Sequence, residues 1–172
     1  VKNTLEKNPF IKEASCYTTN NGMEVGTAKL CIKIVVSFPV LLVFEDDAQP
    51  YYLDNHGKVV TTDSIYAKSM LVANGDIDKD YAKQLAPMAL YISKDDFWNN
   101  QLEQIFVTKN QKEGRKLTLI PRVGNHKILF GTIDNYENKL IRLRRLYEEA
   151  MSKVGWNKYT ELNVEYANQV VG

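Results

Sequence analysis

The spacing of apolar and polar residues predicts a chain rich in short strands. Apolar residues alternate with polar ones in 29–36, which is the period of a β-strand, and 10–18 alternates more loosely. The Asn-Asn-Gly sequence at 20–22 is a strong turn signal, so these two segments are expected to form a hairpin with a long loop. Residues 1–8 are expected to be the end of a helix. Further strands are expected at 38–44, 51–53, 58–60, 101–108, 116–121, 126–130 and 159–166.

Two longer segments have apolar residues at the spacing of an amphipathic helix. In 78–93, Pro87 conflicts with the pattern and requires either a kink or a later helix start. In 131–154, a continuous apolar stripe follows Asp134, the expected N-cap, with a glutamate three residues on as in a capping box. Strands with singly inserted helices indicate an α+β fold with a mostly antiparallel sheet and helices on one face.

Composition gives an ordinary globular protein and limits the kinds of ligand. The 172 residues are 44% hydrophobic and 25% charged, with a net charge of +1, so no global field favours nucleic acid or an acidic membrane. Residues 45–100 carry five lysines against ten acids, whereas 101–172 carry twelve basic residues against eight acids. This uneven distribution is compatible with a charged partner.

The two cysteines and the longest apolar run bear on whether the chain has a disulfide, a zinc site or a membrane span. Cys16 and Cys31 could face each other across the predicted hairpin and form a disulfide, or could be two small buried residues. The sequence contains no cluster of cysteines and histidines that would indicate a zinc site. The apolar run at 32–44 is shorter than the about 20 residues of a membrane span. The chain begins at Val1 without a signal-like region, so we expect it to be part of a longer protein.

Candidate catalytic groups do not assemble into a recognisable motif. His56 and His126 lie near turn glycines and are expected at the surface. The paired acids at 46–47 and 95–96 are expected to bind backbone amides in a turn or at a helix start. The acids at 76–80 resemble the start of a calcium loop but lack its glycine and final glutamate. No phosphate-binding loop or nucleophile elbow is present, so the sequence predicts no enzyme, no cofactor and no metal site.

Four basic residues in the predicted helix at 131–154 have two interpretations. Lys139, Arg142, Arg144 and Arg145 could form a solvated face, because glutamates four residues after Arg144 and Arg145 offer pairing within the helix. The same face could dock a partner.

Several motifs follow one another in a fixed order along the chain. Residues 5–14 read Leu-Glu-Lys-Asn-Pro-Phe-Ile-Lys-Glu-Ala, and Ile-Lys-Ile at 32–34, Pro39-Val40 and Asp-Asn-His-Gly at 54–57 follow. A predicted strand pair with a glycine step spans 120–131, and 162–171 reads Leu-Asn-Val-Glu-Tyr-Ala-Asn-Gln-Val-Val. In order and spacing these motifs resemble the bacterial cell-division family FtsQ/DivIB, with 5–14 similar to the second helix and following strand of a POTRA domain and 162–171 similar to the family's final strand. The sequence resembles the Bacteroidetes branch of the family.

The resemblance implies an organisation and a partner. Residues 1–44 would be the C-terminal half of a POTRA-like domain, an α-β-β unit, and 45–172 an FtsQ-type β domain. Such proteins are non-catalytic divisome scaffolds, held in the inner membrane by one N-terminal helix, with their soluble part in the periplasm. They bind an FtsB/FtsL coiled-coil pair and help organise septal peptidoglycan synthesis. Carried over, the partner-binding residues are Glu165, Tyr166, Ala167, Asn168, Gln169, Val170 and Val171, with Arg144 and Tyr147 on the preceding helix.

Backbone chemistry supplies a mechanism for such a site. A strand at a sheet edge leaves unpaired N–H and C=O groups that a partner strand can complete. Since this pairing tolerates side-chain changes, Glu165 in place of the family's common arginine is compatible with it, and Tyr166 would anchor the contact. The alternative is an inner strand paired on both sides.

Two other functions are compatible with the residues. A glycan-acting enzyme would need two converging carboxylates, for which Asp54, Asp95, Asp96 and Glu103 are the candidates. A POTRA-type chaperone module of an outer-membrane assembly factor would be expected to contain several POTRA repeats, of which the chain has part of one.

Overall fold

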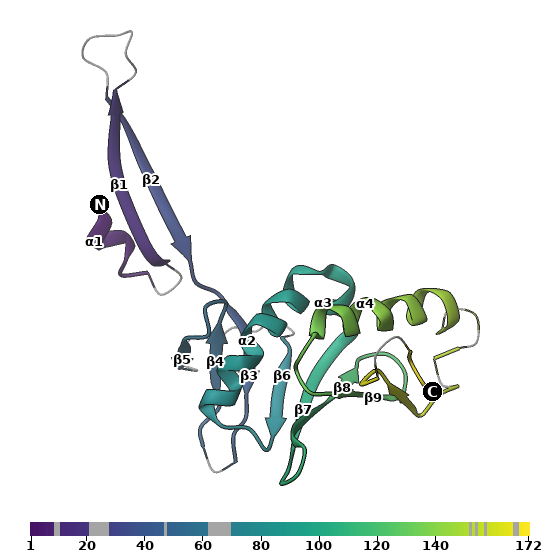
Figure 1. Ribbon diagram of the computed structural model, residues 1–172. Helices are drawn as coiled ribbons and strands as arrows, with labels where there is room; N and C mark the ends of the chain where they lie inside the picture. Colours follow the sequence, from purple (N-terminus) through teal and green to yellow (C-terminus); the bar gives the residue numbers. More distant parts are fainter. Residues whose placement is uncertain are drawn as a thin grey trace. The chain divides into compact units, whose positions relative to one another are not determined.

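The computed structural model describes residues 1–8, 11–20, 28–46, 48–61, 70–151, 153, 155–156, 158–166 and 169–172. The chain forms two compact units, Val1–Phe38 and Pro39–Gly172, drawn in Figure 1. The sequence predicts that the POTRA-like part ends at residue 44. In the structure, residues 39–43 form a strand of the second unit's sheet, and the second unit therefore begins earlier.

The first unit contains the expected helix end and hairpin. It consists of α1 (Lys2–Leu5), β1 (Ile11–Asn20) and β2 (Ala28–Val36), with the two strands antiparallel. Cys16 lies opposite Ile32, and Cys31 lies opposite Tyr17. Because successive residues of a strand point to opposite faces, the two thiols lie on opposite sides of the hairpin. Both cysteines are free, and this register does not allow a disulfide between them.

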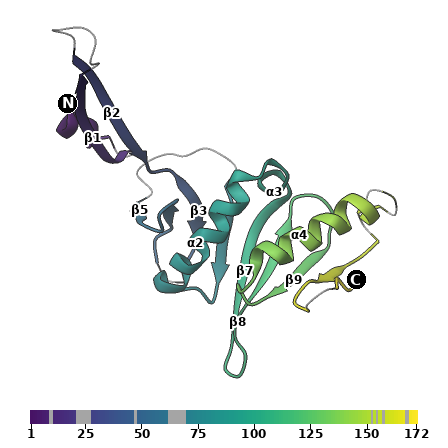
Figure 2. The same ribbon diagram turned by 45° about the horizontal axis from the view of Figure 1, so that its top comes forward.

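The second unit is an eight-stranded sheet covered by helices on one face (Figure 2). The strand order is β10-β9-β8-β7-β6-β3-β4-β5. The strands are β3 (Pro39–Val43), β4 (Tyr51–Asp54), β5 (Val59–Thr61), β6 (Val72–Gly75), β7 (Leu102–Asn110), β8 (Gly114–Pro121), β9 (Lys127–Gly131) and β10 (Glu161–Asn163). The helices are α2 (Lys79–Lys94), α3 (Asp96–Gln101), α4 (Tyr136–Leu146) and the π-helical turn η1 (Tyr147–Met151).

The predicted α+β class is confirmed, with more parallel pairing than a simple meander. Strand pairs β3–β6, β6–β7 and β9–β10 are parallel, and the other pairs of this sheet are antiparallel. The carboxyl ends of β3, β6 and β7 therefore meet at one edge of the sheet. The core lies between the sheet and the helices and contains large side chains such as Trp98, Phe130 and Tyr147.

Several local predictions differ from the structure for identifiable reasons. Helix α2 is continuous through Pro87, which lies on its exposed side, and the Asp78 side chain accepts the Tyr81 N–H at its start. Helix α4 begins after Asn135, which has a left-handed φ of 53° and makes no side-chain cap, so the expected Asp134 cap is wrong. Strand β6 was not predicted, because three of its four residues, Ala73, Asn74 and Gly75, have little strand propensity and the strand depends on pairing with β3 and β7.

Candidate partner-binding edge

Strand β10 is the last strand of the large sheet. It pairs in parallel with β9 on one side, with Leu162 in register with Ile128. Leu162 is 1% exposed and anchors the strand in the core. The strand is shorter than the predicted 159–166: its register with β9 ends at Asn163, and the Val164 N–H makes the last backbone bond, to the Leu129 carbonyl.

The chain that follows β10 is held by Arg142 of α4. Its Nη2 donates to the carbonyl oxygen of Val164 at 3.0 Å and to that of Tyr166 at 3.2 Å. From the sequence, Arg142 is expected in a basic helix face and has no individual role. Its position between the buried stripe and the exposed side of α4 is the only signal of this contact in the sequence. Arg142 therefore fixes the path of the segment proposed to bind a partner.

Glu165 is directed toward the sheet. Its N–H donates to Asn163 Oδ1 at 2.9 Å, and its carboxylate lies 3.1 Å from Lys116 Nζ of β8. Gly131, at φ 73°, leaves the space that Glu165 occupies: a Cβ at that position would lie 2.6 Å from Glu165 Cγ. The Glu165 side chain is thus committed within the unit. Hydrogen bonds to Glu113 and, second, to Glu165 raise the pKa of Lys116.

The C-terminal residues return antiparallel to β10. The Asn163 N–H donates to the Val171 carbonyl at 2.6 Å, and the Val171 N–H donates to the Asn163 carbonyl at 3.0 Å. Val170 packs against the core, while Val171 and Tyr166 are 49% and 56% exposed. Gln169 is exposed, and Ala167 and Asn168 lie outside the described residues. On its outer side, β10 therefore pairs with the C-terminal residues through an isolated bridge between Asn163 and Val171.

Alternation along the backbone determines which groups of this segment face outward. Val171 directs both of its main-chain groups to Asn163. In an extended segment neighbouring residues direct these groups to opposite sides, so those of Val170 and Gly172 point away from β10. The C-terminal segment, rather than β10 itself, is consequently the outer margin of the sheet at this point.

Arg144 is engaged within the second unit. Its Nη1 lies 2.9 Å from Asp95 Oδ2, its Nε lies 2.7 Å from Glu148 Oε1, and its guanidinium lies 4.8 Å from the centre of the Phe97 ring. Lys139, the first member of the predicted basic face, is 6% exposed and donates to the Thr132 carbonyl. The four cations of α4 therefore do not form one face.

Tyr147 lies in the core, with 2% of its surface exposed. Its hydroxyl is 2.6 Å from His126 Nε2, and its ring meets those of Trp98 and Trp156 edge-on or tilted. In this position its side chain supports α4 from inside. Burial raises the pKa of the Tyr147 hydroxyl.

The expected surface position of His126 is wrong, since the residue is 2% exposed. The Tyr147 ring packs edge-on against it and the Trp156 backbone lies beside it, and both residues lie far along the chain, so the nearby turn glycine gave the wrong indication. Burial lowers the pKa of the His126 imidazole, and the backbone of Trp156 acts in the opposite direction.

The acids considered for catalysis have local structural roles. Asp54 accepts the N–H groups of His56 and Lys58 in the turn after β4. Asp95 caps α3 and pairs with Arg144, and Asp96 lies in the first turn of the same helix. Asp54 ends β4, which lies three strands from β7, the strand that carries Glu103. Over the part of the chain that the structure describes, no group of three potential ligands could hold a metal ion.

The arrangement defines a class: an α+β domain with helices on one sheet face and a C-terminal margin formed by β10 and residues 169–172. A family model described as FtsQ/DivIB, C-terminal related, matches residues 38–172, and the chain belongs to this family. The match spans the whole second unit. No curated protein sequence matches the chain.

Family membership indicates a role in cell division. FtsQ/DivIB proteins are generally non-catalytic scaffolds of the divisome, and they are membrane-anchored. None of the helices among the described residues has the length and apolar character needed to cross a membrane.

Proposed function

We propose that this chain is a non-catalytic divisome scaffold that binds FtsB/FtsL-like partners by strand addition at its C-terminal segment. By holding these partners it would help to organise septal peptidoglycan synthesis. The observation that supports the proposal most strongly is the position of β10 at the end of the sheet, bordered by an isolated bridge to Val171. The proposed contact residues are Glu165, Tyr166, Ala167, Asn168, Gln169, Val170 and Val171.

Backbone groups supply the affinity in this proposal. The outward N–H and C=O of Val170 are the first groups that an added strand would meet. Each main-chain hydrogen bond contributes about 0.5–1.5 kcal/mol net, so a strand of several residues gives useful affinity without a deep pocket. The contacts of Arg142 with the Val164 and Tyr166 carbonyls reduce the ordering cost, because they fix the neighbouring chain before the partner arrives.

Tyr166 is the proposed side-chain anchor. It is a large aromatic residue, 56% exposed, beside the segment that Arg142 holds. Tyrosine is enriched among residues that carry much of the energy of an interface. Tyr147 is left out of the contact surface because its side chain is buried, and Arg144 because its guanidinium pairs with Asp95 and Glu148. Glu165, whose carboxylate pairs with Lys116, is kept for its main chain alone.

The first unit is proposed to be the C-terminal half of a POTRA-like domain. The order α1, β1, β2 supports this, since it agrees with the α-β-β order expected of that half. We further propose a single N-terminal membrane anchor and a periplasmic location for the described residues, in line with the anchoring of the family.

The anchor role of Tyr166 can be tested by capture of a purified FtsB/FtsL-like coiled-coil pair from the same organism. We expect Tyr166→Lys to abolish capture while the unfolding midpoint stays unchanged. Tyr17→Lys is a matched control, since Tyr17 is 54% exposed and lies on the hairpin of the first unit. Equal capture by the two variants would refute the proposed site.

A further inference from the structure

The helix-free face of the large sheet carries a row of three residues near the carboxyl ends of its parallel strands. Asn74 of β6 is in register with Phe106 of β7, and the register of Val43 with Ala73 places Phe44 beside Asn74. The neighbours Val43 and Ala73 are fully buried toward the helices. Since strand residues alternate between faces, Phe44, Asn74 and Phe106 point away from the helices.

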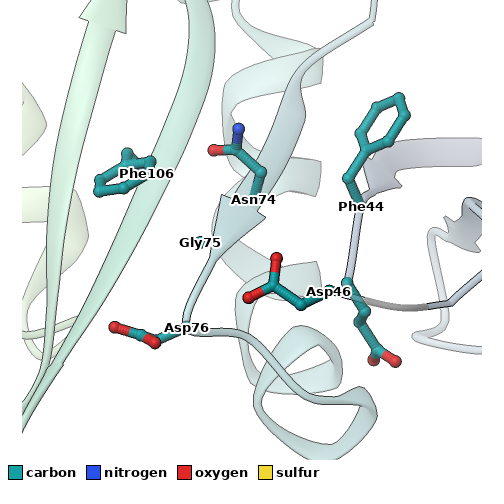
Figure 3. A pocket seen from close by; sticks show the side chains of 7 residues that line it. Phe44, Asp46, Asn74, Gly75, Asp76 and Phe106 are labelled. Carbon is teal, nitrogen blue, oxygen red and sulfur yellow. The ribbon is translucent and has the colours of Figure 1, made fainter.

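The two rings of this row border a pocket of about 500 Å³ (Figure 3). Phe44 and Phe106 are 42% and 39% exposed, and their strands lie two spacings apart, or about 10 Å. The floor between them is low because Asn74 is short and is held by Gln104 Nε2 at 2.8 Å. Gly75 adds no side chain, and a Cβ there would lie 2.2 Å from the Val107 carbonyl oxygen.

Carboxylates line the end of the same pocket. Glu45, Asp46 and Asp76 are among its lining residues, and no lysine or arginine is. Asp76 accepts the Lys109 N–H, and Glu45 accepts the Tyr51 hydroxyl. Within the described ranges, none of these three carboxylates is part of an ion pair. Arg115 donates to the main-chain carbonyl of Asp76, but its ion pair is with Asp78. The pocket therefore combines two exposed aromatic rings with three carboxylates that are free of these ion pairs.

We propose that this pocket, the Phe44–Phe106 pocket, binds an arginine side chain from a basic segment of a protein partner. A guanidinium ion stacks on aromatic rings and forms paired hydrogen bonds with carboxylates, and these are the two features present. Phosphate-bearing ligands such as nucleic acids or anionic lipids would be repelled by the carboxylates.

The inference goes beyond the scaffold function proposed above and does not depend on it. Strand β6 is four strands from β10, which corresponds to about 19 Å across the sheet. A second surface at this distance would let the domain hold a basic segment while its C-terminal margin is occupied. Substitutions in the pocket can thus be made without touching the margin.

The test uses the chain as it is, titrated with the blocked tripeptide Leu-Arg-Leu and followed by amide chemical shifts. We expect shifts at Phe44, at 74–76 and at Phe106, and no comparable shifts with Leu-Gln-Leu. Asp46→Asn should weaken binding about fivefold and Phe106→Ala about threefold, as exposed ion pairs and cation–π contacts do. Glu149→Gln removes the same charge from exposed Glu149 of η1 and should leave binding unchanged.

Three results would overturn the proposal. The first is the absence of peptide-dependent shifts around the pocket in the wild-type chain. The second is equal affinity of the wild type, Asp46→Asn and Phe106→Ala for the arginine peptide, with circular dichroism showing that both variants are folded. The third is equal binding of the glutamine peptide, because it would show that the cation has no role.

Discussion

Replacing Arg142 by methionine removes the guanidinium that holds the chain after β10 while keeping an unbranched, helix-compatible side chain. Two hydrogen bonds are lost, to the carbonyls of Val164 and Tyr166. A bond from a charged donor contributes about 1.5–3 kcal/mol, and the bond to Tyr166 contributes less because it is exposed. The expected loss is therefore about 2 kcal/mol of local stability.

Hydrogen exchange measures this loss directly. A change of about 2 kcal/mol corresponds to roughly 30-fold faster exchange through local opening. We expect this acceleration at the amides of Asn163, Val164 and Val171, and weaker capture of the coiled-coil partner. Arg145→Met, on the exposed side of the same helix, removes the same charge and is the control. If both variants exchange equally at these amides, Arg142 does not fix this segment.

Two further predictions concern stability. Because burial lowers the folded-state pKa of His126, the unfolded state binds more protons below about pH 6.5, and the free energy of unfolding should fall as pH decreases from there. Urea denaturation between about pH 5 and 8 should show this pH dependence of the free energy of unfolding. His126→Gln should lose it, and the control His56→Gln should keep it. A pH dependence retained in His126→Gln would contradict the assignment to His126. Gly131→Ala should lower the urea midpoint more than Gly114→Ala, because both have positive φ but only Gly131 faces Glu165 at close range. Equal midpoints would show that the Glu165 side chain moves aside without loss of stability.

The sequence pattern predicted the elements whose periodicity is strong. The apolar stripe predicted in 131–154 corresponds to the buried side of α4 and η1, where Leu140, Leu143 and Tyr147 lie in the core, and the alternation in 29–36 corresponds to β2. Periodicity reports which side of a helix or strand a residue faces.

The remaining features depend on contacts between distant segments, and these have no local signature. Arg142 reaches two carbonyls more than twenty positions away in sequence, and His126 is buried by residues that follow it after a whole helix. The return of Val171 to Asn163 is likewise a tertiary contact, whereas residues 159–166 alone predicted one longer strand. The C-terminal margin could be located from the sequence, but its pairing could not.

We propose that the outward main chain of Val170 pairs with a partner strand. The affinity of the FtsB/FtsL-like pair for Val170→Pro and Val170→Ala separates main-chain from side-chain binding. Proline removes the outward N–H and alanine keeps it, while both remove the valine side chain. We expect Val170→Ala to bind within a few-fold of the wild type and Val170→Pro to lose binding while remaining folded. Comparable affinities for the two variants would contradict backbone pairing at this residue.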